Sequence, residues 1–207
     1  MLNLKVCGMR GTTNITELIK LQPDFMGFIF HEKSPRNVTE TSNIDFPVTI
    51  RKVGVFVNKG ESFIRDKVTD YKLDFIQLHG NETPKECQDL KEKGLKIIKA
   101  FNISEDFDFD KLKEYETYCY YFLFDAFGKN AGGNGIVFNW DLIQKYKGET
   151  PFLLSGGIDE TMVDKLKNIE HPMFAGIDIN SGFEIKSALK DIKKIEKFKQ
   201  NVIAKGA

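Results

Sequence analysis

The stretch DFIQLHGNETPKECQDLKEKGLKIIKAF, residues 74–101, contains the pattern that decides the fold. It runs from an apolar segment, through a charged segment at 83–94, to a second apolar segment. Helix start and stop signals bound the charged segment. Thr83 is the expected N-cap, Pro84 the first helical residue, Glu86 the capping-box partner and Gly94 the glycine after the C-terminus. The stretch therefore predicts strand, helix and strand, the repeating unit of a parallel sheet.

The same alternation covers the whole chain. Short runs rich in Val, Ile and Phe alternate with longer charged segments of helical period. Eight strands are expected to end near residues 7, 30, 57, 78, 100, 125, 154 and 178. Seven of the following segments have a helical pattern: 13–21, 60–72, 83–94, 104–116, 139–147, 159–169 and 188–203. The segment after Phe30 is expected to carry at most a short helix near residues 37–42.

Eight tight βα units predict a (β/α)₈ TIM barrel, one compact domain over residues 1–207 with a reduced second helix. Such barrels run from ~200 residues upward, so this one is near the lower limit. The alternative is an open doubly wound sheet. We disfavour it because no GxGxxG follows the first strand; the glycine-rich AGGNG, 131–135, follows the sixth strand instead and is expected to flank the site.

Charge and hydropathy exclude some classes of function. The 207 residues include 30 basic and 30 acidic side chains, so there is no basic footprint for nucleic acid. No apolar run approaches the ~20 residues of a membrane span. With no obvious apolar patch either, a monomer is the default expectation.

The cysteines and histidines are scattered. Cys7, Cys87 and Cys119 have no paired spacing, which suits a reduced, cytoplasmic protein better than a disulfide framework. The three histidines show no metal-ligand spacing either. We therefore expect neither a metal nor another cofactor.

Polar residues and glycines collect where the predicted strands end, which is where barrels place their chemistry. The glycine-rich ends of the last two strands predict a phosphate site, because backbone N–H groups there can approach an anion. The residues concerned are Gly156, Gly157, Ser181 and Gly182. The alternative is that these glycines only form tight turns.

Cys7 and Asp125 end the first and sixth strands, roughly across the barrel from each other. A base and an acid on opposite sides of a bound sugar are placed to move protons. Taken alone, Cys7 is more often a small buried hydrophobe, and Asp125 a turn residue. A thiol also serves as a base only if its surroundings lower its pKa from ~8.5.

Three further residues are candidates for substrate binding. Arg36 would sit over the pocket and capture a carboxylate bidentately, although a solvated surface arginine is the commoner case. His79 is either a pocket wall or a turn residue. Asp178 ends the eighth strand and points to the same pole.

Seven motifs, in order, resemble one family. They are KVCGMR, GFIFHEKSPRNV, VGVFVN, IQLHGNE, LFDAFGKNAGGNGIVFNW, LLSGGI and GIDINSGFE, and the match runs from Lys5 to about Phe198. Together they resemble phosphoribosylanthranilate isomerase of tryptophan biosynthesis. The resemblance implies a (β/α)₈ barrel and a cofactor-free Amadori rearrangement of a phosphosugar aminoaldose to an aminoketose.

The resemblance also implies roles for residues. Asp125 would be the acid that opens the furanose ring, and Cys7 the base that removes the C2 proton. Arg36 would hold the anthranilate carboxylate, and Asp178 would contact the substrate near its amine or hydroxyls. The four loop residues of the last two strands would bind the phosphate.

Rival functions remain on the sequence alone. Another phosphosugar barrel, an indole-glycerol-phosphate synthase or a ribulose-phosphate epimerase, would need strand-end Lys and Glu or a His/Asp metal set, and neither pattern is visible. A non-catalytic phosphosugar-binding barrel would not need both Cys7 and Asp125. A purely structural subunit predicts tight partner binding without turnover.

Overall fold

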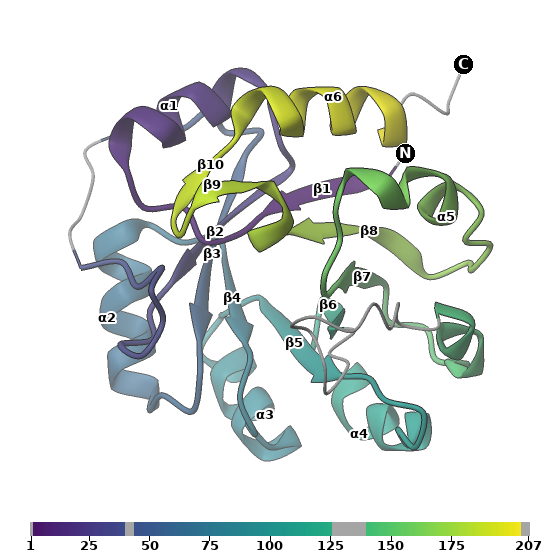
Figure 1. The fold of residues 1–207 in the computed structure, drawn as a ribbon. Helices are drawn as coiled ribbons and strands as arrows, with labels where there is room; N and C mark the ends of the chain where they lie inside the picture. The colour runs from purple at the N-terminus through teal and green to yellow at the C-terminus, as the bar shows by residue number, and fades with distance from the viewer. Residues whose placement is uncertain (1, 40–43, 126–139, 204–207) are drawn as a thin grey trace.

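The computed structural model describes residues 2–39, 44–125 and 140–203 (Figure 1). Eight parallel strands form a closed barrel in chain order, and β8 closes it by pairing with β1. The strands are β1 (Asn3–Val6), β2 (Phe25–Ile29), β3 (Arg51–Phe56), β4 (Phe75–Leu78), β5 (Ile97–Asn102), β6 (Tyr121–Asp125), β7 (Phe152–Ser155) and β8 (Phe174–Ile179). The predicted fold class is confirmed.

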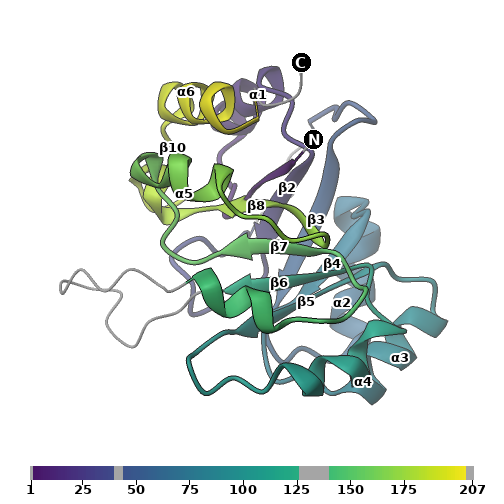
Figure 2. The ribbon, with the colours of Figure 1, turned by 90° about the vertical axis from the view of Figure 1, so that its right-hand side faces the viewer.

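Helices surround the barrel, as two views at right angles show (Figures 1 and 2). The α-helices are α1 (Thr12–Lys20), α2 (Glu61–Tyr71), α3 (Pro84–Glu92), α4 (Lys113–Glu116), α5 (Val163–Lys167) and α6 (Ile192–Ile203). Short 3₁₀ segments are η1 (Phe109–Leu112), η2 (Trp140–Lys145), η3 (Glu160–Met162) and η4 (Ser181–Phe183). Among the described residues, no helix is long and apolar enough to cross a membrane.

The cap predicted for α3 is present. The Glu86 backbone N–H donates to Thr83 Oγ1 at 3.2 Å, and Glu86 Oε2 accepts from the Thr83 backbone N–H at 2.7 Å. Pro84 occupies the first turn, where no backbone donor is needed. This helix therefore begins at the residue that its capping sequence predicts.

The second βα unit lacks a helix in its described part, residues 30–39 and 44–50. Asn37 instead forms a parallel bridge with Ile29, and the Val38 N–H donates to the Ile29 carbonyl at 2.9 Å. Backbone groups used in this way are not available for a helical turn. The short helix expected near 37–42 is thus absent over 37–39, and residues 40–43 lie outside the described ranges.

The helix expected over 188–203 begins later than predicted. Strands β9 (Glu184–Lys186) and β10 (Leu189–Lys190) form an antiparallel hairpin before α6 starts. Ala188 has φ of 63°, which no right-handed helix contains. The Asn14 side chain also bonds both the N–H and the C=O of Lys190, at 2.8 and 3.0 Å. Tertiary bonding to α1 therefore overrides the helical pattern there.

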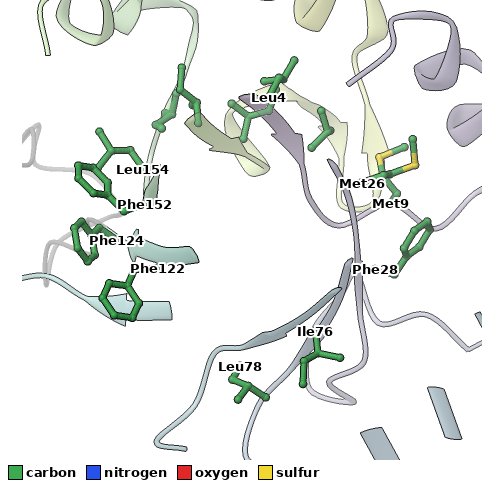
Figure 3. Close-up of a cluster of buried hydrophobic side chains, with 14 of the residues drawn as sticks. Leu4, Met9, Met26, Phe28, Ile76, Leu78, Phe122, Phe124, Phe152 and Leu154 are labelled. Atoms are coloured by element: carbon green, nitrogen blue, oxygen red, sulfur yellow. The ribbon is translucent and has the colours of Figure 1, made fainter. Parts of the chain in front are cut away.

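Alternate side chains of each strand face opposite sides, which divides the core in two. One cluster lies between strands and helices, where the labelled side chains point away from the barrel axis (Figure 3). The other fills the barrel interior and comprises Phe25, Val53, Phe75, Ile98, Ala100, Leu123 and Leu153. The interior is therefore packed with apolar side chains below the strand ends.

Candidate active site

The inward-facing positions become polar toward the carboxyl ends of the strands. Gln77 lies two residues beyond Phe75 on β4, and Asp125 lies two residues beyond Leu123 on β6. Because strand side chains alternate with period two, these residues share the inner face. We call the inward polar residues at this end the mouth cluster: Lys5, Cys7, Gln77, His79, Asp125 and Asp178. An apolar barrel thus carries titratable groups at one pole.

Lys5 and Asp178 form a buried ion pair inside the barrel. The strand register places them opposite each other on β1 and β8, and Lys5 Nζ lies 2.8 Å from Asp178 Oδ2. Their side chains are 0% and 5% exposed. Burial opposes the charge of Lys5, but attraction to Asp178 and Cys7 leaves its pKa above its ordinary value. A permanent ammonium ion therefore stands next to the candidate base.

Cys7 follows β1 and packs its sulfur against β2. A Cβ added to Gly27 would lie 2.7 Å from Cys7 Sγ, so only glycine leaves this space. Burial raises the pKa of the Cys7 thiol, while the Lys5 and Lys190 ammonium groups act in the opposite direction. The thiol is therefore the favoured form in this structure, and the condition that the surroundings lower its pKa is not met here.

Asp125 lies at the end of β6 in contact with His79. The carboxylate Oδ2 is 3.2 Å from His79 Nε2, and His79 Nδ1 is 2.9 Å from Gln77 Nε2. Asp125 and His79 both act electrostatically on Asp178, which in turn holds Lys5. The structure therefore links Asp125 through Asp178 to the Lys5 and Cys7 side of the mouth cluster.

Arg36 lies over the end of β1 and is held by Glu184. Its Nε donates to Glu184 Oε1 at 2.9 Å, and Nη2 donates to Oε2 at 2.5 Å. Glu184 also accepts from Lys190 Nζ at 2.7 Å, and Lys190 bonds Asn180 Oδ1 at 2.6 Å. A Cβ on Gly8 would clash with both Arg36 and Asn180, which shows how closely this network covers the strand end. One edge of the Arg36 guanidinium is thus already engaged by a carboxylate.

The predicted phosphate-binding residues occupy two adjoining loops. Gly156 and Gly157 have φ of 93° and 63°, a backbone conformation that favours glycine. Ser181 and Gly182 start η4 after β8. A Cβ on Gly182 would collide with the Ile158 carbonyl, so the two loops touch at this point. Their roles stay predictions.

Two further expectations concern the glycine-rich loop and metal binding. The AGGNG loop, 131–135, lies outside the described residues. Within residues 2–39, 44–125 and 140–203, no group of three or more His, Cys, Asp or Glu side chains is placed to hold a metal ion.

Sequence reasoning did not identify four residues of this region: Lys5, Gln77, Glu184 and Lys190. Lys5 and Gln77 carried a signal, because each is a polar residue two positions from a candidate on the same strand face. Glu184 and Lys190 carried no such signal, since residues 184–190 were expected to lead into the helix at 188–203.

The chain is similar to one enzyme family along nearly its whole length. The family model of N-(5'-phosphoribosyl)anthranilate (PRA) isomerase matches residues 4–201. The N-(5'-phosphoribosyl)anthranilate isomerase of Parabacteroides distasonis is 48% identical over 205 residues, which cover 97% of this chain and 93% of that protein.

Solved structures show the same architecture. A phosphoribosylanthranilate isomerase in complex with reduced 1-(o-carboxyphenylamino)-1-deoxyribulose 5-phosphate superimposes with a TM-score of 0.80 at 26% identity, covering 99% of this chain and 100% of the other. Monomers generated from the dimeric enzyme of Thermotoga maritima give 0.78 at 24% identity, covering 98% and 99%. Given the model match over nearly the whole chain and the close relative, this chain belongs to the N-(5'-phosphoribosyl)anthranilate isomerase family, the isomerases of tryptophan biosynthesis.

Proposed function

We propose that Asp125 and Cys7 carry the proton transfers of the family's reaction in this chain. The reaction converts the aminoaldose N-(5-phosphoribosyl)anthranilate into the aminoketose 1-(2-carboxyphenylamino)-1-deoxyribulose 5-phosphate. The observation that carries the assignment is the change from apolar to polar on the inner barrel face, where β6 ends in Asp125 and β1 leads into Cys7. Chemistry in this fold takes place at that end of the barrel.

Asp125 acts as the acid. It protonates the furanose ring oxygen as the C1–O bond breaks, and the nitrogen lone pair forms a protonated imine. The Asp125 side chain is 17% exposed, so part of it is open to a substrate. Proton donation of this kind is typically worth ~10²–10⁴-fold in rate.

Cys7 then acts as the base that removes the C2 proton, giving an enolamine that tautomerises to the ketone. The thiol has to ionise for this step, although burial raises its pKa. Lys5 and Lys190 are the two cations that favour the thiolate. The two lysines therefore assist Cys7 as a base by favouring its ionised form.

The remaining candidates hold the substrate. Asp178 keeps its buried Oδ1 without a hydrogen-bond partner among the described residues, which suits an N–H or O–H of the substrate. Arg36 uses Nε and Nη2 on Glu184, so the anthranilate carboxylate would be bound through Nη1. The phosphate would lie against Gly156, Gly157, Ser181 and Gly182, where backbone N–H groups favour anions.

Asp125→Asn tests the assignment. Its kcat should fall by ~10²–10⁴-fold while the reduced product analogue still binds, because the amide keeps the shape and cannot donate the proton. Asp74→Asn is the matched control. Asp74 immediately precedes β4, where it accepts from the Lys52 N–H, so it lies at the amino ends of the strands, away from Asp125. Turnover is followed by anthranilate fluorescence without added metal. A kcat near that of the parent would remove Asp125 from this role.

Assembly and location complete the proposal. We infer a monomer in a reducing, cytoplasmic compartment. The three cysteines are all free thiols. Light scattering of the purified chain tests the first part, and a dimer at micromolar concentration would contradict it. Cell fractionation tests the second part, and recovery outside the cytoplasm would contradict it.

A further inference from the structure

Gln77 is buried next to the candidate acid and has one side-chain atom without a partner. The residue is 1% exposed, and its Nε2 lies 2.9 Å from His79 Nδ1. Its Oε1 makes no hydrogen bond to any described residue. Burying such an acceptor unpaired is unfavourable, so the unpaired oxygen needs an explanation.

The two ends of the Gln77 amide explain why its oxygen is unpaired. An amide offers an N–H₂ donor on one side and a carbonyl acceptor on the other, and a half-turn of the last side-chain bond exchanges them. With Nε2 toward His79, Nδ1 accepts, so the ring proton sits on Nε2 and is donated to Asp125 Oδ2, 3.2 Å away. With Oε1 toward His79, Nδ1–H is the donor, and Nε2 shares a second proton with Asp125.

These two arrangements differ by one proton. In the first, the His79–Asp125 pair holds a single proton, and Asp125 is a carboxylate that cannot act as an acid. In the second, the pair holds two protons, and one of them can lie on Asp125. The orphaned Oε1 is the atom that accepts a hydrogen bond only in the second arrangement.

We propose that Gln77 is a positioning residue that sets the proton count of the His79–Asp125 pair, and that His79 reloads Asp125 after each turnover. This rests on the proposed role of Asp125. When Asp125 has given its proton to the ring oxygen, His79 keeps only its Nδ1–H and is neutral. The ring, 28% exposed, then takes a proton from water at Nε2, and this Nε2–H moves to the Asp125 carboxylate. As the enolamine tautomerises, C1 takes the proton that Cys7 removed from C2 and the enol O–H returns one proton to solvent, so the cycle balances.

The surroundings support this reading. Among the described residues, the charged groups on the β1 and β8 side of the pair include Lys5 and Asp178, and Lys5 already holds Asp178 Oδ2. Cys7 is a further titratable group on that side, and burial raises the pKa of its thiol, which favours the neutral form. On β5, the Lys99 ammonium bonds the carbonyls of Leu78 and Gly80, on either side of His79, at 3.3 and 2.9 Å. His79 therefore sits on a firmly held segment, and the amide is the part that turns.

The first test needs no turnover. The chain has only three histidines, so ¹⁵N spectra of the imidazoles can be assigned by the signal lost in His79→Gln. At high pH, His79 in the parent should carry its proton on Nε2. In Gln77→Glu, the new carboxylate only accepts, so His79 should stay doubly protonated to a pH higher by roughly 1–3 units. A neutral His79 with its proton on Nδ1 in the parent, or an unmoved titration in Gln77→Glu, would overturn the proposal.

The second test links the protonation of His79 to catalysis. The alkaline fall of kcat should follow the His79 titration in the parent and move up with it in Gln77→Glu. Gln77→Leu should lose about tenfold or more in kcat at neutral pH, the scale of a lost hydrogen bond to a charged group. Gln144→Glu adds the same charge on η2, where the amide donates to the Glu170 carbonyl, and should leave the profile unchanged.

The outcomes separate the two proposals. If Asp125→Asn is inactive while the kcat profile ignores the His79 titration, only the role of Gln77 is lost. If Asp125→Asn is active, the proposed function itself fails. Should Gln77→Leu not fold, the spectra and pH profile of Gln77→Glu still decide.

Discussion

Lys5 and Asp178 are register partners on β1 and β8, and their side chains form a 2.8 Å ion pair inside the barrel. The pair joins the first and last strands at the seam where the barrel closes. It also sets the electrostatics of Cys7, because Lys5 favours the thiolate and Asp178 opposes it. One contact thus serves barrel closure and the candidate base.

Removing Lys5 should therefore affect both stability and activity. Lys5→Met leaves Asp178 buried and unpaired, which should lower the free energy of unfolding by about 3–5 kcal/mol. The double variant Lys5→Met/Asp178→Leu should recover most of that loss, since an apolar pair carries no buried charge. Urea unfolding measures both. Activity should stay low in the double variant; recovered kcat would mean that Lys5 acts only in folding.

The pH dependence of Cys7 follows from its burial. A raised pKa means less thiolate at neutral pH than an exposed cysteine has, and the thiolate forms only as the pH rises beyond the ordinary titration range of a cysteine. Alkylation of Cys7 by iodoacetamide should therefore be slow at pH 7 and accelerate through the alkaline range. Lys5→Met should shift this rise to still higher pH. Cys7→Ser provides the background from Cys87 and Cys119, and rapid modification at pH 7 would contradict the expectation.

Glu184 should control substrate affinity through Arg36. Glu184→Ala removes the acceptor for two guanidinium nitrogens and leaves Lys190, fully buried, without its carboxylate. We expect KM to rise more than kcat falls, together with a stability loss of about 3–5 kcal/mol. Glu184→Gln keeps an acceptor for Arg36 and should lose less of each. Equal effects of the two substitutions on KM would show that orientation of Arg36 is not the cause.

Gly27 should be required for the position of the Cys7 sulfur. In Gly27→Ala the new methyl group would lie 2.7 Å from Sγ and 3.0 Å from Cα of Cys7, closer than packed atoms approach. Overpacking of this kind typically costs ~1–3 kcal/mol, and displacement of the thiol should reduce kcat beyond that loss of stability. Gly11→Ala is the control, because its Cβ meets nothing within 4 Å. Unchanged kcat in Gly27→Ala would show that the sulfur position is not critical.

The sequence by itself determined the fold class and the positions of the strands. Periodicity is a local property, and in β4 and α3 the apolar run, capping box and proline all agree, so these elements form where they were expected. The same logic placed Asp125 and Asp178 at strand ends, because parallel strands in a closed barrel bring those ends to one pole.

The tertiary structure alone decided how the side chains pair. Glu184 meets Arg36 across 148 residues, and Lys190 meets Asn14 across 176, and these contacts turn the expected start of the last helix into a hairpin. It also decided that Cys7 rests as a thiol, since burial depends on what β2 and β8 place around the sulfur. Patterns along the chain report which face a residue takes; charge, desolvation and partner choice arise only when distant segments meet.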